Sequence, residues 1–125
     1  MRALVADDHE GHQRLLSAIL NSLGVEVDLA SDGAQAVAAA TRTSFNLILM
    51  DVSMPGLDGL AATRKIREHE AAQRWPRANI IMVTSHAEAC DYSRSSEAGA
   101  DGHVTKPLSI AGLLGAIEGH YMDEV

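Results

Sequence analysis

Residues 46–56 read NLILMDVSMPG, and this stretch decides how the rest of the chain can be arranged. The four aliphatic residues 47–50 lead directly into Asp51, and a Pro-Gly pair follows at 55–56. A short apolar run bounded by turn residues is typical of a strand that is buried on both faces of a sheet. Because a charge is costly inside such a strand, we expect Asp51 just past its C-terminal end, where parallel sheets bind ligands.

Further strands and helices alternate along the chain, judged from apolar runs, period-2 alternation, helical spacing and position. The predicted strands are residues 3–6, 25–30, 47–50, 80–83 and 103–105. The predicted helices are residues 11–23, 34–41, 59–70, 87–98 and 109–121. Such alternation produces right-handed βαβ units and a parallel sheet that is covered on both faces. We therefore predict a single α/β domain over residues 1–125, a flavodoxin-like (βα)5 fold with strand order 2-1-3-4-5 and residues 25–30 at an edge.

Composition limits the classes of protein that fit. The 125 residues carry a net charge of −7, which argues against direct binding to nucleic acid, since that needs a basic surface. The one cysteine, Cys90, rules out a disulfide framework and fits a reducing, cytoplasmic setting. No apolar run approaches the length of a membrane span, so we expect no membrane association.

The predicted helix over residues 59–70 has Leu60, Thr63 and Ile66 three positions apart, and Asp58 is placed to cap its start. We expect the charged residues between Arg64 and Glu70 to cover its solvent side. Four histidines are likewise expected at the surface, with no function assigned. These are His9, His12, His69 and His120.

Polar residues follow the ends of four predicted strands. These are Asp7 and Asp8, then Asp51, Thr84 and Lys106. Neighbouring strands lie only about 5 Å apart, so the three carboxylates should converge, and they cannot all stay ionised without a cation. Oxygen ligands in an open site suit Mg²⁺. Lys106 would add a compact positive charge, and Thr84 a hydroxyl donor.

Such a site suits a phosphoryl group that moves onto a carboxylate oxygen. A metal ion and Lys106 would neutralise its equatorial oxygens while Asp51 attacks phosphorus in line. An ionised carboxylate needs no general base to act as a nucleophile. This fits the absence of a Ser-His-Asp or Cys-His arrangement near the strand ends.

Taken together, these motifs resemble the receiver domain of bacterial two-component response regulators, such as the chemotaxis response regulator, over essentially the whole chain. The matching segments are Asp7-Asp8, Asp51, residues 54–56 and 58–59, Thr84, residues 99–101 and Lys106-Pro107. The resemblance implies a signalling domain that is not an ordinary enzyme, although it promotes its own phosphorylation and dephosphorylation. Asp51 would take its phosphoryl group from the phosphohistidine of a sensor histidine kinase or a histidine phosphotransfer protein.

The resemblance also implies individual roles in the site. Asp8 would bind Mg²⁺ directly, Asp7 mostly through water, and Ser53 through its backbone carbonyl. Thr84 and Lys106 would bind the phosphoryl group.

Other implied roles concern regulation. His103 stands where the family usually has Tyr or Phe, whose ring turns inward when Thr84 moves, and a histidine there adds sensitivity to pH. Ser53 and His86 hold the positions that tune the lifetime of the phosphoaspartate. The peptide bond before Pro107 would be cis. A downstream protein would bind helix 87–98, strand 103–105 and helix 109–121.

Alternative functions remain at this stage. The chain could act alone, or it could be a receiver cut from a hybrid histidine kinase or multidomain regulator, which residues 67–70 and the loop before Ile80 resemble. An aspartyl-phosphate phosphatase of the haloacid-dehalogenase type fits less well, because Ser53 stands where such enzymes need a second acid. A flavodoxin-type cofactor binder is disfavoured, since Asp7-Asp8 would repel a phosphate. The complete acidic set argues against a degenerate receiver that only binds partners.

Overall fold

The computed structural model of the chain describes residues 1–52, 54, 56–84 and 97–105, and only the backbone of Thr84, His103 and Thr105. In chain order the elements are β1 (Arg2–Ala6), α1 (Glu10–Ser22), β2 (Glu26–Ala30), α2 (Gly33–Arg42), β3 (Leu47–Asp51), α3 (Gly59–Gln73), β4 (Asn79–Thr84) and β5 (Gly102–Thr105). The strands pair in parallel in the order β2-β1-β3-β4-β5. The predicted α/β fold and strand order are therefore confirmed. The predicted helices over 87–98 and 109–121 lie mostly or wholly outside the described residues.

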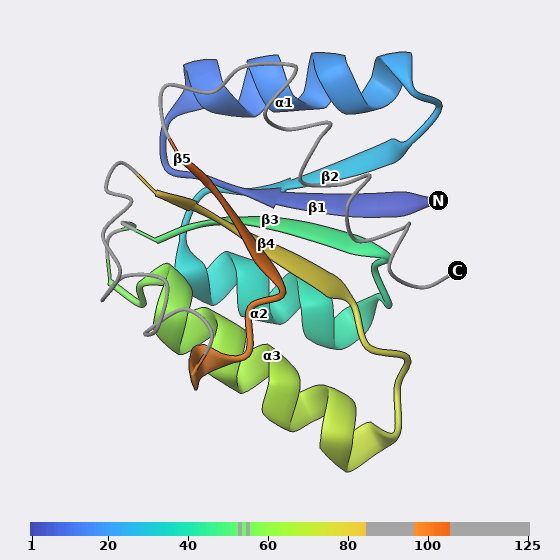
Figure 1. Cartoon of the computed structure of the whole chain (residues 1–125), viewed down its shortest axis with the longest axis vertical. Coiled ribbons are helices and arrows are strands. Elements are labelled where there is room, and N and C mark those ends of the chain that lie inside the picture. The colour runs from blue at the N-terminus through green and yellow to red at the C-terminus, as the bar shows by residue number, and fades with distance from the viewer. Residues whose placement is uncertain (53, 55, 85–96, 106–125) are drawn as a thin grey trace.

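Helices cover both faces of the sheet, with α1 on one side and α2 and α3 on the other (Figure 1). Alternate residues of the central strands point to opposite faces. In β3, Ile48 and Met50 pack toward α2 and α3, whereas Leu47 and Leu49 pack toward α1. All four are at most 2% exposed. This burial on both faces explains why residues 47–50 are apolar without interruption.

The two helices that follow β2 and β3 begin in the same way. Asp32 accepts a hydrogen bond from the backbone N–H of Gln35 (2.7 Å), and Asp58 accepts one from Ala61 (2.8 Å). Each carboxylate satisfies an N–H group that has no partner within the helix, and such a cap contributes about 1 kcal/mol. The cap predicted at Asp58 is confirmed.

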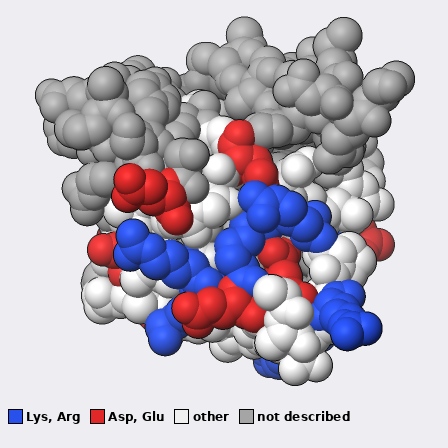
Figure 2. Space-filling model, turned by 60° about the horizontal axis from the view of Figure 1, so that its bottom comes forward, with Lys and Arg blue, Asp and Glu red and all other residues white. Residues whose placement is uncertain are grey.

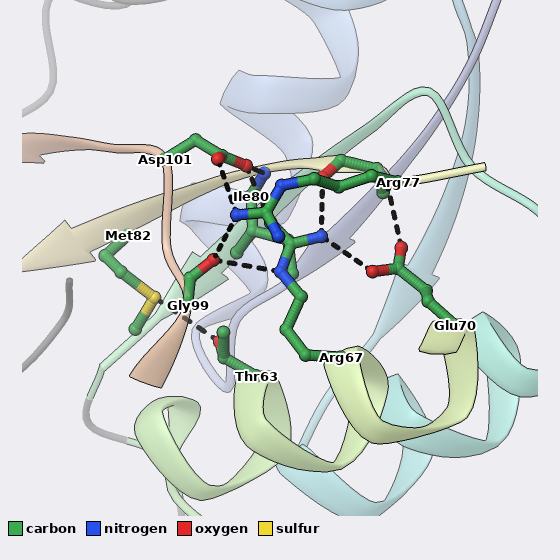
Figure 3. Close-up of polar contacts among 9 residues, drawn as sticks. Thr63, Arg67, Glu70, Arg77, Ile80, Met82, Gly99 and Asp101 are labelled. Atoms are coloured by element: carbon green, nitrogen blue, oxygen red, sulfur yellow. Dashed lines mark hydrogen bonds and ion pairs between the residues drawn. The ribbon is translucent and has the colours of Figure 1, made fainter. Parts of the chain in front are cut away.

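The expectation that α3 turns all its charged residues to solvent is wrong. Arg67 lies beneath the loop that precedes β5, and its side chain is 12% exposed. Its guanidinium group donates to the Gly99 carbonyl (2.9 Å), to Glu70 (2.7 Å) and to Asp101 (2.6 Å), as Figure 3 shows. Arg77 also binds Asp101, at 2.9 Å. We call Arg67, Glu70, Arg77 and Asp101 the Arg67 cluster.

The Arg67 cluster joins three segments that are distant in sequence. Glu70 on α3 accepts a hydrogen bond from the backbone N–H of Ala78 (2.8 Å), and Asp101 accepts one from Ile80 (3.0 Å). Arg67 also donates to the carbonyl of Ala78 (2.8 Å). Basic and acidic side chains consequently gather on the side of the molecule where α3 lies (Figure 2). The cluster therefore fixes where β4 begins and how the chain enters β5.

The pKa of Asp101 is lowered from its ordinary value of 3.8. Burial is the largest single influence and would raise this pKa, but it is outweighed by the hydrogen bonds from Ile80 and Arg77 and by the charges of Arg67 and Arg77. A carboxylate with a lowered pKa in the folded state stabilises the fold above its unfolded pKa. This contribution is lost as the pH falls through the lowered folded value.

We therefore expect the stability advantage of the native chain over Asp101→Asn to be full above about pH 3.8 and to shrink at more acidic pH. Urea unfolding of both proteins at several pH values above and below about 3.8 measures the difference in their free energies of unfolding. The comparison removes the effect of the other carboxylates, which titrate in both. An advantage that stays constant or grows on acidification contradicts the expectation.

Two of the histidines expected at the surface make contacts instead. The ring of His69 meets the ring of Trp75 edge-on, with 4.7 Å between centroids, and its Nε2 is buried without a hydrogen-bond partner among the described residues. His12 contacts Asp7, as described below. Among the helices that the structure describes, none has the length and apolar character needed to cross a bilayer.

Candidate metal and phosphoryl site

Three carboxylates meet at the C-terminal edge of the sheet. Asp7 directly follows β1, and Asp51 is the last residue of β3 rather than the first residue beyond it. Because Ala6 pairs with Met50, the residues that follow them, Asp7 and Asp51, lie side by side. Asp7, Asp8 and Asp51 each offer an oxygen, and these atoms all lie within 4.8 Å of one another. The convergence predicted from the strand ends is present.

The burial of these acids differs. Asp7 is 1% exposed and Asp51 is 2% exposed, whereas Asp8 is exposed. Like charges at this separation repel, and burial adds a desolvation cost for the ionised form. A divalent cation removes both penalties, and Mg²⁺ accepts one or two carboxylates while it keeps several waters. The donor set and its open side at Asp8 therefore fit Mg²⁺.

Asp7 is held in place by α1 and by β2. Its carboxylate accepts a hydrogen bond from the backbone N–H of His9 (2.8 Å) and lies 3.2 Å from Nδ1 of His12. Gln13, a buried side chain, donates to the carbonyl of Asp7 (2.6 Å). The N–H of Asp7 donates to the carbonyl of Ala30 (3.0 Å). The main chain and the carboxylate are thus fixed by separate partners.

Two glycines, at the starts of α2 and α3, allow the backbone to approach the segment after β3 closely. A Cβ at Gly59 would meet the carbonyl of Asp51, and one at Gly33 would meet the carbonyl of Leu57. The N–H of Gly59 donates to the carbonyl of Val52 at 3.0 Å. Only glycine permits so close a backbone approach. The pairs Asp32-Gly33 and Asp58-Gly59 combine a cap with this contact, and the repeated Asp-Gly pair was the signal in the sequence.

Sequence reasoning did not identify His12 or Gln13 as parts of this site. They follow Asp7 by five and six positions, and the chain changes from strand to helix in between. Neither the strand nor the helix periodicity therefore predicts that they lie close to Asp7. A helix that begins at Glu10 brings its first turn over Asp7. A polar Gln13 on the buried face of α1 was the one available sign.

The remaining predicted site residues are described in part or not at all. Thr84 is the last residue of β4, and the residue before it, Val83, pairs with Asp51 of β3. His103 of β5 pairs with Met82 of β4. Ser53, His86, Lys106 and Pro107 lie outside the described residues, so their predicted roles stay predictions.

Comparison with known proteins decides the family. The response regulator receiver domain pattern matches residues 3–118. The chain belongs to the response regulator receiver domain family. A receiver domain is a phosphoacceptor module of two-component signalling and not an enzyme in the ordinary sense. This membership excludes the phosphatase and flavodoxin-type alternatives.

Individual relatives agree with this membership. The chain is 38% identical over 108 residues to the sensor protein GacS of Pseudomonas syringae pv. syringae, covering 86% of this chain but 12% of that protein. The receiver domain of the sensor histidine kinase PA1611 from Pseudomonas aeruginosa is 38% identical, with a TM-score of 0.79 and 90% of each chain covered. That structure has a magnesium ion in its active-site cleft.

A third relative was solved with a partner. It is a Saccharomyces cerevisiae complex of a histidine phosphotransfer signaling protein and the receiver domain of its downstream response regulator. The matching chain is 26% identical to this one with a TM-score of 0.83, and the match covers 91% of this chain and 83% of the yeast chain.

Proposed function

We propose that this receiver domain accepts a phosphoryl group on Asp51 while Mg²⁺ is bound by Asp7, Asp8 and Asp51. The observation that supports this assignment is the set of three acidic oxygens within 4.8 Å at the end of β3. An oxygen of Asp51 attacks phosphorus, the bond between phosphorus and the donor's histidine nitrogen breaks, and its electron pair returns to the imidazole. When bound, Mg²⁺ neutralises charge on the transferring group.

The acids are proposed to divide their roles by exposure. Asp8 is open to solvent and binds the ion directly, together with the backbone carbonyl of Ser53. Asp7 is buried and already accepts hydrogen bonds on both oxygens, which supports contact with the ion through water. Thr84 and Lys106 would hold the phosphoryl oxygens, as their places at the ends of the fourth and fifth strands suggest.

The proposed partners follow from the relatives. A histidine phosphotransfer protein or a sensor histidine kinase donates the phosphoryl group, as supported by the yeast complex and by the two sensor kinases. His103 would report phosphorylation to a downstream protein that binds residues 87–98, 103–105 and 109–121. His86 and Ser53 would set the lifetime of the phosphoaspartate.

We also propose that residues 1–125 form one receiver domain that works in the cytoplasm. Since the chain spans 12% of GacS, the activity of the whole protein is a separate matter. The similarity to two sensor kinases favours a receiver of the hybrid-histidine-kinase type over a stand-alone regulator.

Binding of beryllofluoride, which mimics a phosphoryl group on a carboxylate, tests the function. We expect a bound fluorine NMR resonance with Mg²⁺ present, its loss on addition of EDTA, and its absence from Asp8→Asn. Asp28→Asn is a matched control, because Asp28 is a half-exposed acid on β2 that pairs with Arg2. A bound resonance that survives EDTA, or one of equal intensity in Asp8→Asn, would contradict the proposal.

A further inference from the structure

The carboxylate of Asp7 has a protein donor on each oxygen. Oδ1 accepts from the backbone N–H of His9 at 2.8 Å, and Oδ2 lies 3.2 Å from Nδ1 of His12. The backbone contact is present with any residue at position 9. The contact to Oδ2 depends on the side chain at position 12. Hence one side chain of α1 contacts the second oxygen of a buried acid in the candidate metal site.

The chemistry of the pair fixes which atom donates. An ionised carboxylate only accepts hydrogen bonds, so a hydrogen bond to ionised Asp7 requires the hydrogen on Nδ1 of His12. The His12 side chain is 34% exposed, and its ring contacts the ring of His9, with 4.4 Å between centroids and the planes tilted by 31°. In this arrangement Nδ1 of His12 faces Asp7.

We propose that His12 is a positioning residue for the divalent cation, acting through Asp7. This inference rests on the proposed metal site and adds a residue to it. With both oxygens anchored from α1, each keeps a second lone pair for a water that the ion carries. Hydrogen bonds of this kind to metal-site carboxylates typically change metal affinity by about 10–100-fold when removed.

The other contacts of Asp7 do not replace His12. Gln13 donates to the main-chain carbonyl of Asp7 and to the carbonyl of Ala30, so it fixes the backbone and makes no hydrogen bond to the carboxylate. Loss of the His12 side chain would therefore leave Oδ2 without its donor while the strand end stays in place. Metal affinity should change far more than the stability of the metal-free fold.

Three substitutions distinguish a donor at the position of Nδ1 from simple packing. In His12→Asn the side-chain amide lies where Nδ1 lies in histidine. In His12→Gln the same amide is one carbon farther out, near the position of Nε2. His12→Ala has no donor. Arg14→Ala is the matched control, because Arg14 is on the same helix and its side chain is 77% exposed.

Calorimetric titration with Mg²⁺ measures the effect, and thermal unfolding in EDTA monitors the fold. We expect His12→Ala and His12→Gln to bind Mg²⁺ about tenfold more weakly. His12→Asn and Arg14→Ala should stay within about twofold of the native chain, and all four should unfold in EDTA near the native temperature.

Two results overturn the inference. One is native or tighter Mg²⁺ affinity in His12→Ala. The other is an equal loss in His12→Asn and His12→Gln, accompanied by a parallel fall in the unfolding temperature, which would assign His12 a packing role. Failure of the proposed function looks different, because the native chain would then bind no Mg²⁺ or Asp8→Asn would bind it equally well.

Discussion

We expect Asp51→Asn to abolish phosphoryl uptake from acetyl phosphate in the presence of Mg²⁺, and the native chain to gain the mass of one phosphoryl group. An asparagine amide is neutral and a poor nucleophile, so no acyl phosphate forms at this position. Intact mass spectrometry at several reaction times measures the labelled fraction. The expected effect is complete loss, because the proposed reacting atom itself is replaced.

The fold is expected to survive this substitution. Asp51 is 2% exposed and lies within 4.8 Å of two other acids, so removal of its charge relieves repulsion in the metal-free protein. Asp28→Asn serves as a control that keeps its label, since Asp28 is remote from the site on β2. If Asp51→Asn were labelled to the native extent, another residue would have to be the phosphoacceptor.

Arg67→Met is expected to lower the free energy of unfolding by about 3–5 kcal/mol. Arg67 neutralises Glu70 and Asp101, whose side chains are 10% and 18% exposed, and it satisfies the carbonyls of Ala78 and Gly99. Methionine fills similar volume but removes the side-chain donor to Glu70 and to the Ala78 carbonyl, and among the described residues it leaves Arg77 as the one arginine that contacts Asp101 and Gly99. Because small domains are stable by only about 5–15 kcal/mol, such a loss is a large share of the total.

Urea unfolding with matched variants isolates the cause. Arg64→Met removes an exposed arginine from the same helix and should change stability by less than about 0.5 kcal/mol. Arg67→Lys keeps the charge but not the planar set of donors, so an intermediate loss is expected. A loss below about 1 kcal/mol in Arg67→Met would show that the cluster contributes little net stability.

The periodicity of α3 already pointed to this cluster. Glu70 is four positions after Ile66 and is buried with it, and Arg67, four positions after Thr63, lies partly buried beside this stripe. Their charge led to the expectation of exposure, since charged residues are seldom buried unless paired. Glu70 is three positions from Arg67 on the same helix, but Asp101 lies 34 positions away, and no local pattern identifies it.

For the residues that the structure describes, the sequence by itself determined the strands, the approximate places of three helices, the strand order through the family resemblance, and the place of the acids at the strand ends. These features depend on local periodicity, caps and burial on both faces of a sheet, which a few neighbouring residues encode. Only the tertiary structure decided that Arg67 is partly buried, that His12 contacts Asp7, and that the backbone at Gly33 and Gly59 lies against the carbonyls of Leu57 and Asp51. Each of these contacts depends on how close folding brings separate segments of the chain, and local hydrophobic patterns do not predict that distance.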